Sequence, residues 1–230
     1  MFDGDWKDFI QLDPFRSLAL LGARVPVLLE DATKVQQQPI NFDRTHSVIS
    51  ELLDLDQDLI CWHARRPSGW FFPKPTDDLS QDIPHGAFQY EDGTFRLTLN
   101  LVTWCTYRIH VLKALLCLQQ YIDNGQSTYK HIADTLSRMA DEIAAISQIF
   151  FTIAETCRTH SPTNDILHRV GCWMFIRPLS VALGVKEARV ETRQWILDKL
   201  ISLGDDEEHE DAATLAKHYM TTTAGSWEDY

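Results

Sequence analysis

The chain has 230 residues, a hydrophobic fraction of 44% and a formal net charge of −12 at pH 7, which is typical of one large globular domain. The acidic balance argues against direct nucleic-acid binding, because phosphate contacts need clustered lysine and arginine. No secretory signal is visible, and no apolar run approaches the ~18 residues of a membrane span. The sequence therefore predicts an intracellular protein, in the nucleus or cytoplasm, without membrane contact.

The cysteines predict neither disulfides nor a metal site. They are odd in number, widely spaced and mostly in apolar settings, as expected for reduced core thiols. A zinc site requires close pairs such as C-x2-C, and none is present. We therefore expect no bound metal and no cofactor. The five are Cys61, Cys105, Cys117, Cys157 and Cys172.

The first predicted helix begins at Asp13 and Pro14, because aspartate caps helix N-termini and proline is favoured at the first helical position. The apolar run over residues 15–35 contains Pro26. Proline removes a helical hydrogen bond, so we expect either a kink or two short helices there.

A second amphipathic helix is predicted over residues 43–63, with a broad apolar face. Its acidic side chains fall mostly on the opposite, solvated side. Asp56 is the exception, because helical periodicity places it in the apolar arc between Leu52 and Ile60. It therefore needs a partner or a hydrated environment.

Residues 67–93 form the least regular stretch and hold four of the nine prolines. Loops this long are uncommon in compact domains and are often functional. The aromatic side chains of Trp70, Phe71 and Phe72 are expected to pack on apolar surface. One interpretation is a loop pinned across the bundle, and the other is a mobile lid over a pocket or a partner-docking edge.

Residues 98–122 predict a long central helix that is apolar over most of its circumference and belongs inside a bundle. One narrow polar stripe runs along it. Arg108 lies instead in the middle of the apolar arc, next to Trp104 and Leu112. The stripe comprises Thr103, Thr106, His110, Lys113, Cys117 and Gln120.

Further helices are predicted over residues 129–158, 165–182 and 188–203, followed by a short last helix and a loose tail at 221–230. Trp173 and Met174 are expected to point inward, and Pro178 to kink its helix. The tryptophans 62, 104, 173 and 195 lie at helical spacing and favour core positions. The predicted fold is all-α, one domain over residues 1–220, with six to eight helices around the central helix.

Three segments resemble the C-terminal regulatory region of fungal binuclear zinc-cluster transcription factors. Residues 104–109, WCTYRI, resemble that family's aromatic-x-x-Tyr-Arg motif, and Tyr90 to Asp92 match its preceding Tyr-x-Asp loop. Residues 140–147, ADEIAAIS, are similar to an A-x-E-I-x-x-S segment. Residues 177–182, RPLSVA, with RQWI at 193–196, resemble its terminal pattern. The order is kept, and the resemblance covers roughly residues 50–220.

The resemblance implies a helical regulatory domain that binds a small hydrophobic metabolite or a regulatory protein and influences transcription of a metabolic gene cluster. Family members carry a six-cysteine DNA-binding cluster with a basic linker, and this sequence has neither. The chain is therefore expected not to bind DNA by the family's route.

An enzyme is the alternative, because cofactor-free cyclisation or isomerisation of a secondary metabolite needs a shaped, water-excluding pocket more than a motif. No P-loop, G-x-G-x-x-G, G-x-S-x-G or H-E-x-x-H motif is present. Candidate catalytic residues would be Arg108, Asp56 and His110, although a partly exposed histidine is the simpler interpretation of His110. Candidate ligand-binding residues are Arg108, Asp56, Trp104, Trp70 and Phe71.

Arg108 and Asp56 are the best candidates to pair with each other, with Glu142 and Asp82 as alternative partners of the arginine. A buried charge without a partner is too costly to persist. Two environments remain open at this point, a dry core in which the pair is structural and a cavity in which it binds a ligand.

Overall fold

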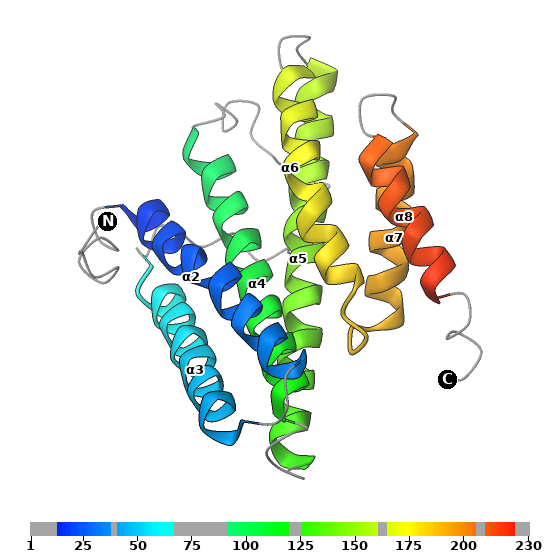
Figure 1. The fold of residues 1–230 in the computed structure, drawn as a ribbon. Helices are drawn as coiled ribbons and strands as arrows, with labels where there is room; N and C mark the ends of the chain where they lie inside the picture. Colours follow the sequence, from blue (N-terminus) through cyan, green and yellow to red (C-terminus); the bar gives the residue numbers. More distant parts are fainter. Residues whose placement is uncertain are drawn as a thin grey trace.

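The structure, a computed structural model, describes residues 13–37, 41–66, 92–119, 126–160, 165–205 and 210–223. These residues form seven helices and contain no strand, so the predicted all-α fold is confirmed (Figure 1). The helices are α2 (Pro14–Gln37), α3 (Phe42–Ala64), α4 (Asp92–Gln119), α5 (Gln126–His160), α6 (Asp165–Leu183), α7 (Val190–Gly204) and α8 (Glu210–Thr223).

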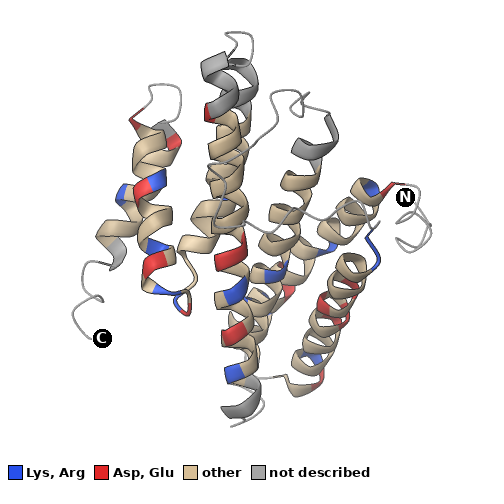
Figure 2. Ribbon diagram, turned by 180° about the vertical axis from the view of Figure 1, so that it is seen from behind, with Lys and Arg blue, Asp and Glu red and all other residues tan. Residues whose placement is uncertain are grey.

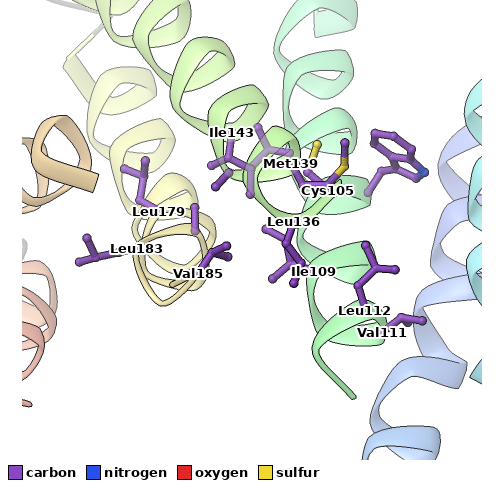
Figure 3. Close-up of a cluster of buried hydrophobic side chains, with 14 of the residues drawn as sticks. Cys105, Ile109, Val111, Leu112, Leu136, Met139, Ile143, Leu179, Leu183 and Val185 are labelled. Carbon is purple, nitrogen blue, oxygen red and sulfur yellow. The ribbon is translucent and has the colours of Figure 1, made fainter. Parts of the chain in front are cut away.

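Helix α4 is the centre of the bundle. It packs against α2, α3, α5 and α6, while α7 and α8 pack on each other and on α6. Its apolar side chains pack against those of α5, as Figure 3 shows for Ile109 of α4 beside Leu136 of α5. The prediction of a buried central helix is confirmed, although the helix begins at Asp92, six residues earlier than expected.

The segment Leu97–Leu118 of α4 is long and apolar enough to cross a membrane by length and composition. The expectation that no apolar segment is long enough to span a membrane was therefore wrong as far as length and composition are concerned. Since 61% of its apolar window is buried inside the bundle, the segment is explained as the core helix of a bundle. The described part of the chain is consistent with a soluble protein.

Helix α2 begins where the sequence predicts. The backbone amide of Arg16 donates to the Asp13 carboxylate at 3.0 Å, so Asp13 caps the helix. Pro26 lies inside this helix, which continues from Pro14 to Gln37 without a break, so the alternative of two short helices was wrong. Packing of Leu21, Val25 and Leu28 into the core holds the helix together across the missing hydrogen bond.

Trp173 of α6 was expected to point inward, but 61% of its surface is exposed. The inward face of α6 is set by Cys172, Phe175 and Leu179, which follow helical spacing and are all buried. Trp173 lies about 100° away from Cys172 around the helix. It is therefore directed outward, and Met174 is only partly buried.

Several predictions concern residues that the structure does not describe. Residues 67–91, including Trp70 and Phe71, lie outside the described ranges, whereas Asp92 and Gly93 open α4. The C-terminal tail was predicted to begin at residue 221, but α8 continues to Thr223. The one-domain prediction over residues 1–220 stays a prediction.

The α7–α8 contact is close enough to predict a mutational effect. A Cβ atom added at Gly204 would lie 2.5 Å from the backbone nitrogen of Ala213 and 2.6 Å from its Cα. A backbone cannot rotate away as a side chain can, so Gly204→Ala should push the two helices apart. We expect it to lower the free energy of unfolding by about 1–3 kcal/mol, measured by urea denaturation.

Gly184→Ala is the matched control for Gly204→Ala. A Cβ atom at Gly184 would meet its nearest neighbours at 3.6 Å or beyond, an ordinary van der Waals separation. Its stability should stay within about 0.5 kcal/mol of wild type. Equal destabilisation by both substitutions would contradict the close α7–α8 contact.

Candidate functional site

Arg108 and Asp56 meet where α3 crosses α4. The Arg108 Nε lies 2.7 Å from Asp56 Oδ1, and Nη2 lies 3.1 Å from Oδ2. This is the bidentate geometry that makes arginine–carboxylate pairs both strong and directional. Only 7% of the arginine side chain and 15% of the aspartate side chain are exposed. The prediction that these two residues pair is therefore confirmed, and α3 is joined to α4 by a buried ion pair.

Trp104 forms the apolar wall of this site. Its indole ring lies 5.3 Å below the Arg108 guanidinium and stacks on the His63 ring with centroids 4.1 Å apart. The indole Nε1 donates to the Leu59 carbonyl at 2.8 Å. Trp104 thus satisfies the polar atom of its buried ring and presents one face to a cation, an attractive arrangement.

Arg66 adds a second cation at the end of α3. Its Nη2 lies 2.6 Å from Nε2 of His63, and its Nε donates to the His63 carbonyl at 2.9 Å. In this contact the imidazole accepts a hydrogen bond, which requires its neutral form with the proton on Nδ1. Arg66 therefore holds His63 against Trp104 in one tautomer.

Helix α5 closes the site from the other side. The Cys105 thiol donates to Glu142 Oε2 at 3.5 Å, and Met139 Sδ lies 4.0 Å from Arg108 Nη1. Burial, followed by the nearby Glu142 carboxylate, raises the pKa of the Cys105 thiol well above its usual value. Cys105 is therefore a neutral, buried thiol that is unsuited to nucleophilic attack.

The pKa of His63 predicts a pH dependence of stability. Burial, followed by the charges of Arg66 and Arg108, lowers this pKa from 6.5 to about 4. Between these values the unfolded chain binds a proton that the folded protein does not bind. The stabilising contribution of neutral His63 is thus complete above pH 6.5 and is lost progressively as the pH falls toward 4.

A His63→Gln variant should therefore lose less stability than wild type between pH 7 and pH 4.5, measured by urea denaturation at each pH. His46→Gln is the matched control, because His46 is an exposed histidine of the same helix. Identical pH profiles for wild type and His63→Gln would contradict the assignment.

An exposed apolar stripe on α3 borders the ion pair. Phe42, Leu53 and Ile60 are 59%, 52% and 38% exposed. Together with the partly buried Ile49, they follow at spacings of seven, four and seven residues and share one helix face. Asp56 lies beside this stripe, between Leu53 and Ile60, so the buried pair is immediately next to exposed apolar surface.

The other predicted site residues are divided between two places. Trp104 joins Arg108 and Asp56, but His110 lies on the opposite side of α4, where it is partly buried. The structure therefore separates His110 from the other two candidate catalytic residues. Whether Arg108, Asp56 or Trp104 contacts a ligand stays a prediction.

Sequence reasoning missed His63 and Arg66 as parts of this site. His63 follows Asp56 by seven residues, which places both on one face of α3, and that spacing was a usable signal. Arg66 follows the last turn of α3, where its Nε donates to the His63 carbonyl. Glu142 was proposed as a partner of Arg108 but contacts Cys105 instead.

Among the residues that the structure describes, no group of three histidine, cysteine or acidic side chains is placed to hold a metal ion. Comparisons with protein-family models, curated proteins and solved structures gave no match to the chain. The resemblance to the zinc-cluster regulators therefore stays a prediction, which rests on the short motifs quoted above.

Proposed function

We propose that this chain is a helical regulatory domain of fungal zinc-cluster type, which docks a regulatory protein on α3 and thereby modulates transcription of a metabolic gene cluster. It acts in the nucleus through a partner and not through DNA contacts of its own. The observation that carries the proposal is the exposed apolar stripe of α3, formed by Phe42, Ile49, Leu53 and Ile60, above the Arg108–Asp56 pair.

The length of this stripe favours a protein partner over a metabolite. Phe42 and Ile60 are separated by 18 residues, which corresponds to about 27 Å along a helix. A small molecule would cover a fraction of that length, whereas an amphipathic helix covers it with several successive turns. Aligned, exposed apolar side chains are typical of protein interaction sites.

The charge of α3 indicates the kind of helix that binds. The helix carries five acidic residues and one arginine, and Figure 2 shows the acidic positions along it. Asp43 and Asp54 flank the apolar stripe on its solvent side. A partner helix with an apolar face and basic flanks would match both features, and complementary charge would accelerate association.

The buried ion pair connects the docking surface on α3 to the central helix α4. Because Asp56 lies beside the stripe and bonds Arg108 of the central helix, a displacement of α3 changes the α3–α4 packing. A buried, directional pair has discrete alternatives, bonded or separated, and is suited to a two-state response.

A tethered reporter tests the proposal. The full chain is fused to an unrelated DNA-binding domain in a fungal reporter strain, and transcription is expected to change at least about threefold relative to the DNA-binding domain alone. Leu53→Asp should abolish the change, because docking would bury an unpaired carboxylate in an apolar contact. Val27→Asp is the matched control, since Val27 is a 59% exposed apolar residue of α2 outside the stripe.

Thermal unfolding of each purified variant separates loss of docking from loss of fold. An unchanged reporter with the wild-type chain contradicts the proposal, as does equal loss of signal in both variants. Turnover of a pathway intermediate by the purified chain, without any reporter effect, would favour the enzyme alternative.

A further inference from the structure

The outer side of α7 carries an exposed apolar stripe. Val190 and Ile201 are 56% and 37% exposed, and Leu197 between them is only partly buried. The three residues follow at spacings of seven and four, so they share one side of the helix. The other side of α7 packs into the bundle through Ile196 and Leu200, which are fully buried. Helix α7 therefore has apolar side chains toward solvent as well as toward the core.

Helix α8 extends this stripe into a patch on two helices. The helices α7 and α8 lie side by side and run antiparallel (Figure 1), and they approach closely where Gly204 meets Ala213. Seven residues further along each helix, Met220 of α8 lies opposite Leu197 of α7. Met220 is 40% exposed. The α7–α8 patch is formed by Val190, Leu197, Ile201 and Met220.

Charges of opposite sign border the patch on its two long sides. Asp198 lies about 80° around α7 from the apolar stripe, on the side away from α8. Lys217 lies about 60° around α8 from Met220, on the side away from α7. Both side chains are exposed, and neither takes part in an ion pair of the described residues. Counted from the Gly204–Ala213 contact, they differ in height along the helices by two residues, or about 3 Å.

We propose that the α7–α8 patch is the interface of a homodimer whose two-fold axis runs parallel to these helices. This axis places α7 of one copy against α8 of the other, so that Met220 of one copy packs beside Leu197 of the other. Lys217 of each copy then meets Asp198 of the other at nearly the same height. The contact forms twice, as a two-fold interface requires.

The charges select this axis over the other two-fold arrangement. An axis perpendicular to the helices would place the two copies of α7 against each other. Their exposed acidic residues, Glu191 and Asp198, would then face the same residues of the second copy, and like charges at an interface oppose association. The parallel axis instead pairs an acidic border with a basic one.

The size of the patch predicts a weak dimer. Helices α7 and α8 have 15 and 14 residues, which gives a length of about 20 Å, and packed helices lie about 8–10 Å apart. Their outer side therefore offers several hundred Å² per copy, which is typical of weak, reversible interfaces. We expect a dissociation constant of about 10–100 μM.

This inference does not rest on the proposed function. Helix α3 and the α7–α8 pair lie on opposite sides of the molecule (Figure 1), so a dimer leaves the α3 stripe of each copy accessible. Self-association is measured with the purified chain alone. Its failure is therefore distinguishable from failure of the reporter experiment.

Sedimentation velocity of the full chain at increasing protein concentration tests the inference. We expect a shift from monomer to dimer between about 2 and 200 μM. Ile201→Asp and Met220→Asp should each weaken dimerisation at least about tenfold, because the dimer would bury an unpaired carboxylate. Leu53→Asp and Val27→Asp are the matched controls, since they introduce the same charge at exposed apolar positions of α3 and α2. Both controls should dimerise as the wild type does.

A charge exchange tests the two-fold axis. Lys217→Glu and Asp198→Lys should each weaken dimerisation at least about threefold, because each variant places two like charges opposite each other. The double variant exchanges the two signs and forms the pair again, so its dissociation constant should return to within about twofold of wild type. Thermal unfolding of each variant confirms the fold before sedimentation.

Three results would overturn the inference. The first is a wild-type chain that stays monomeric over the whole concentration range. The second is equal weakening by Ile201→Asp and Leu53→Asp, which would indicate self-association away from the α7–α8 patch. The third is a charge-exchanged double variant that dimerises no better than the two single variants, which would exclude the contact between Lys217 and Asp198.

Discussion

Asp56→Ala is expected to lower the free energy of unfolding by about 3–5 kcal/mol, because it leaves the Arg108 guanidinium buried without its carboxylate. Only 7% of the Arg108 side chain is exposed. Water therefore cannot replace the two hydrogen bonds, at 2.7 and 3.1 Å, that the guanidinium donates to Asp56. Arg108→Met should cost a similar amount through the unpaired aspartate. Urea denaturation at pH 7 measures both.

The double variant Asp56→Ala/Arg108→Met should cost distinctly less than the sum of the two single variants, because neither charge is then left unpaired. Asp58→Ala provides the control. Asp58 pairs with Arg24 at 2.8 Å, but 42% of that arginine side chain is exposed, so its loss should cost less than about 1 kcal/mol. Strict additivity of the two single variants would contradict a coupled pair.

Trp104→Ala is expected to be the second large effect, at about 3–5 kcal/mol. The substitution removes a ring that is 4% exposed, its hydrogen bond to the Leu59 carbonyl and the surface on which His63 stacks. Trp104→Phe keeps an aromatic ring but loses the indole hydrogen bond to the Leu59 carbonyl and part of the buried ring surface, so we expect it to cost about 1–3 kcal/mol.

Trp173→Ala is the control for Trp104→Ala, since it removes the same side chain from an exposed position. Its stability should remain within about 0.5 kcal/mol of wild type. If Trp173→Ala proved as destabilising as Trp104→Ala, the outward position of Trp173 would be contradicted. Chemical denaturation followed by far-ultraviolet circular dichroism measures both without relying on tryptophan fluorescence.

The fold was largely predictable because long helices repeat their apolar pattern many times. The helix over residues 43–63 was predicted within one residue of α3 at either end. Pro26 was harder to interpret, since its effect depends on tertiary packing that offsets one missing hydrogen bond. The position of Trp173 was missed because size and apolarity were weighted above its phase relative to Cys172 and Phe175.

The site was predictable only where a charged residue falls on the apolar face of its own helix. Arg108 and Asp56 were found because each is a charge within an apolar arc, and two such exceptions require each other. Arg66 lies after the last turn of α3, where helical periodicity no longer fixes direction. The contact of Glu142 with Cys105 depends on how α5 is rotated against α4, and the sequence of one helix does not specify that rotation.

The α3 docking surface is tested most directly by comparing stripe and non-stripe substitutions in the tethered reporter at matched protein levels. We predict that Leu53→Asp and Ile60→Asp each abolish the transcriptional effect and that Val27→Asp retains it, while the midpoints of thermal unfolding of all three variants stay within about 4 °C of wild type. Full reporter activity in the folded Leu53→Asp and Ile60→Asp variants would contradict the proposed docking of a regulatory protein on α3.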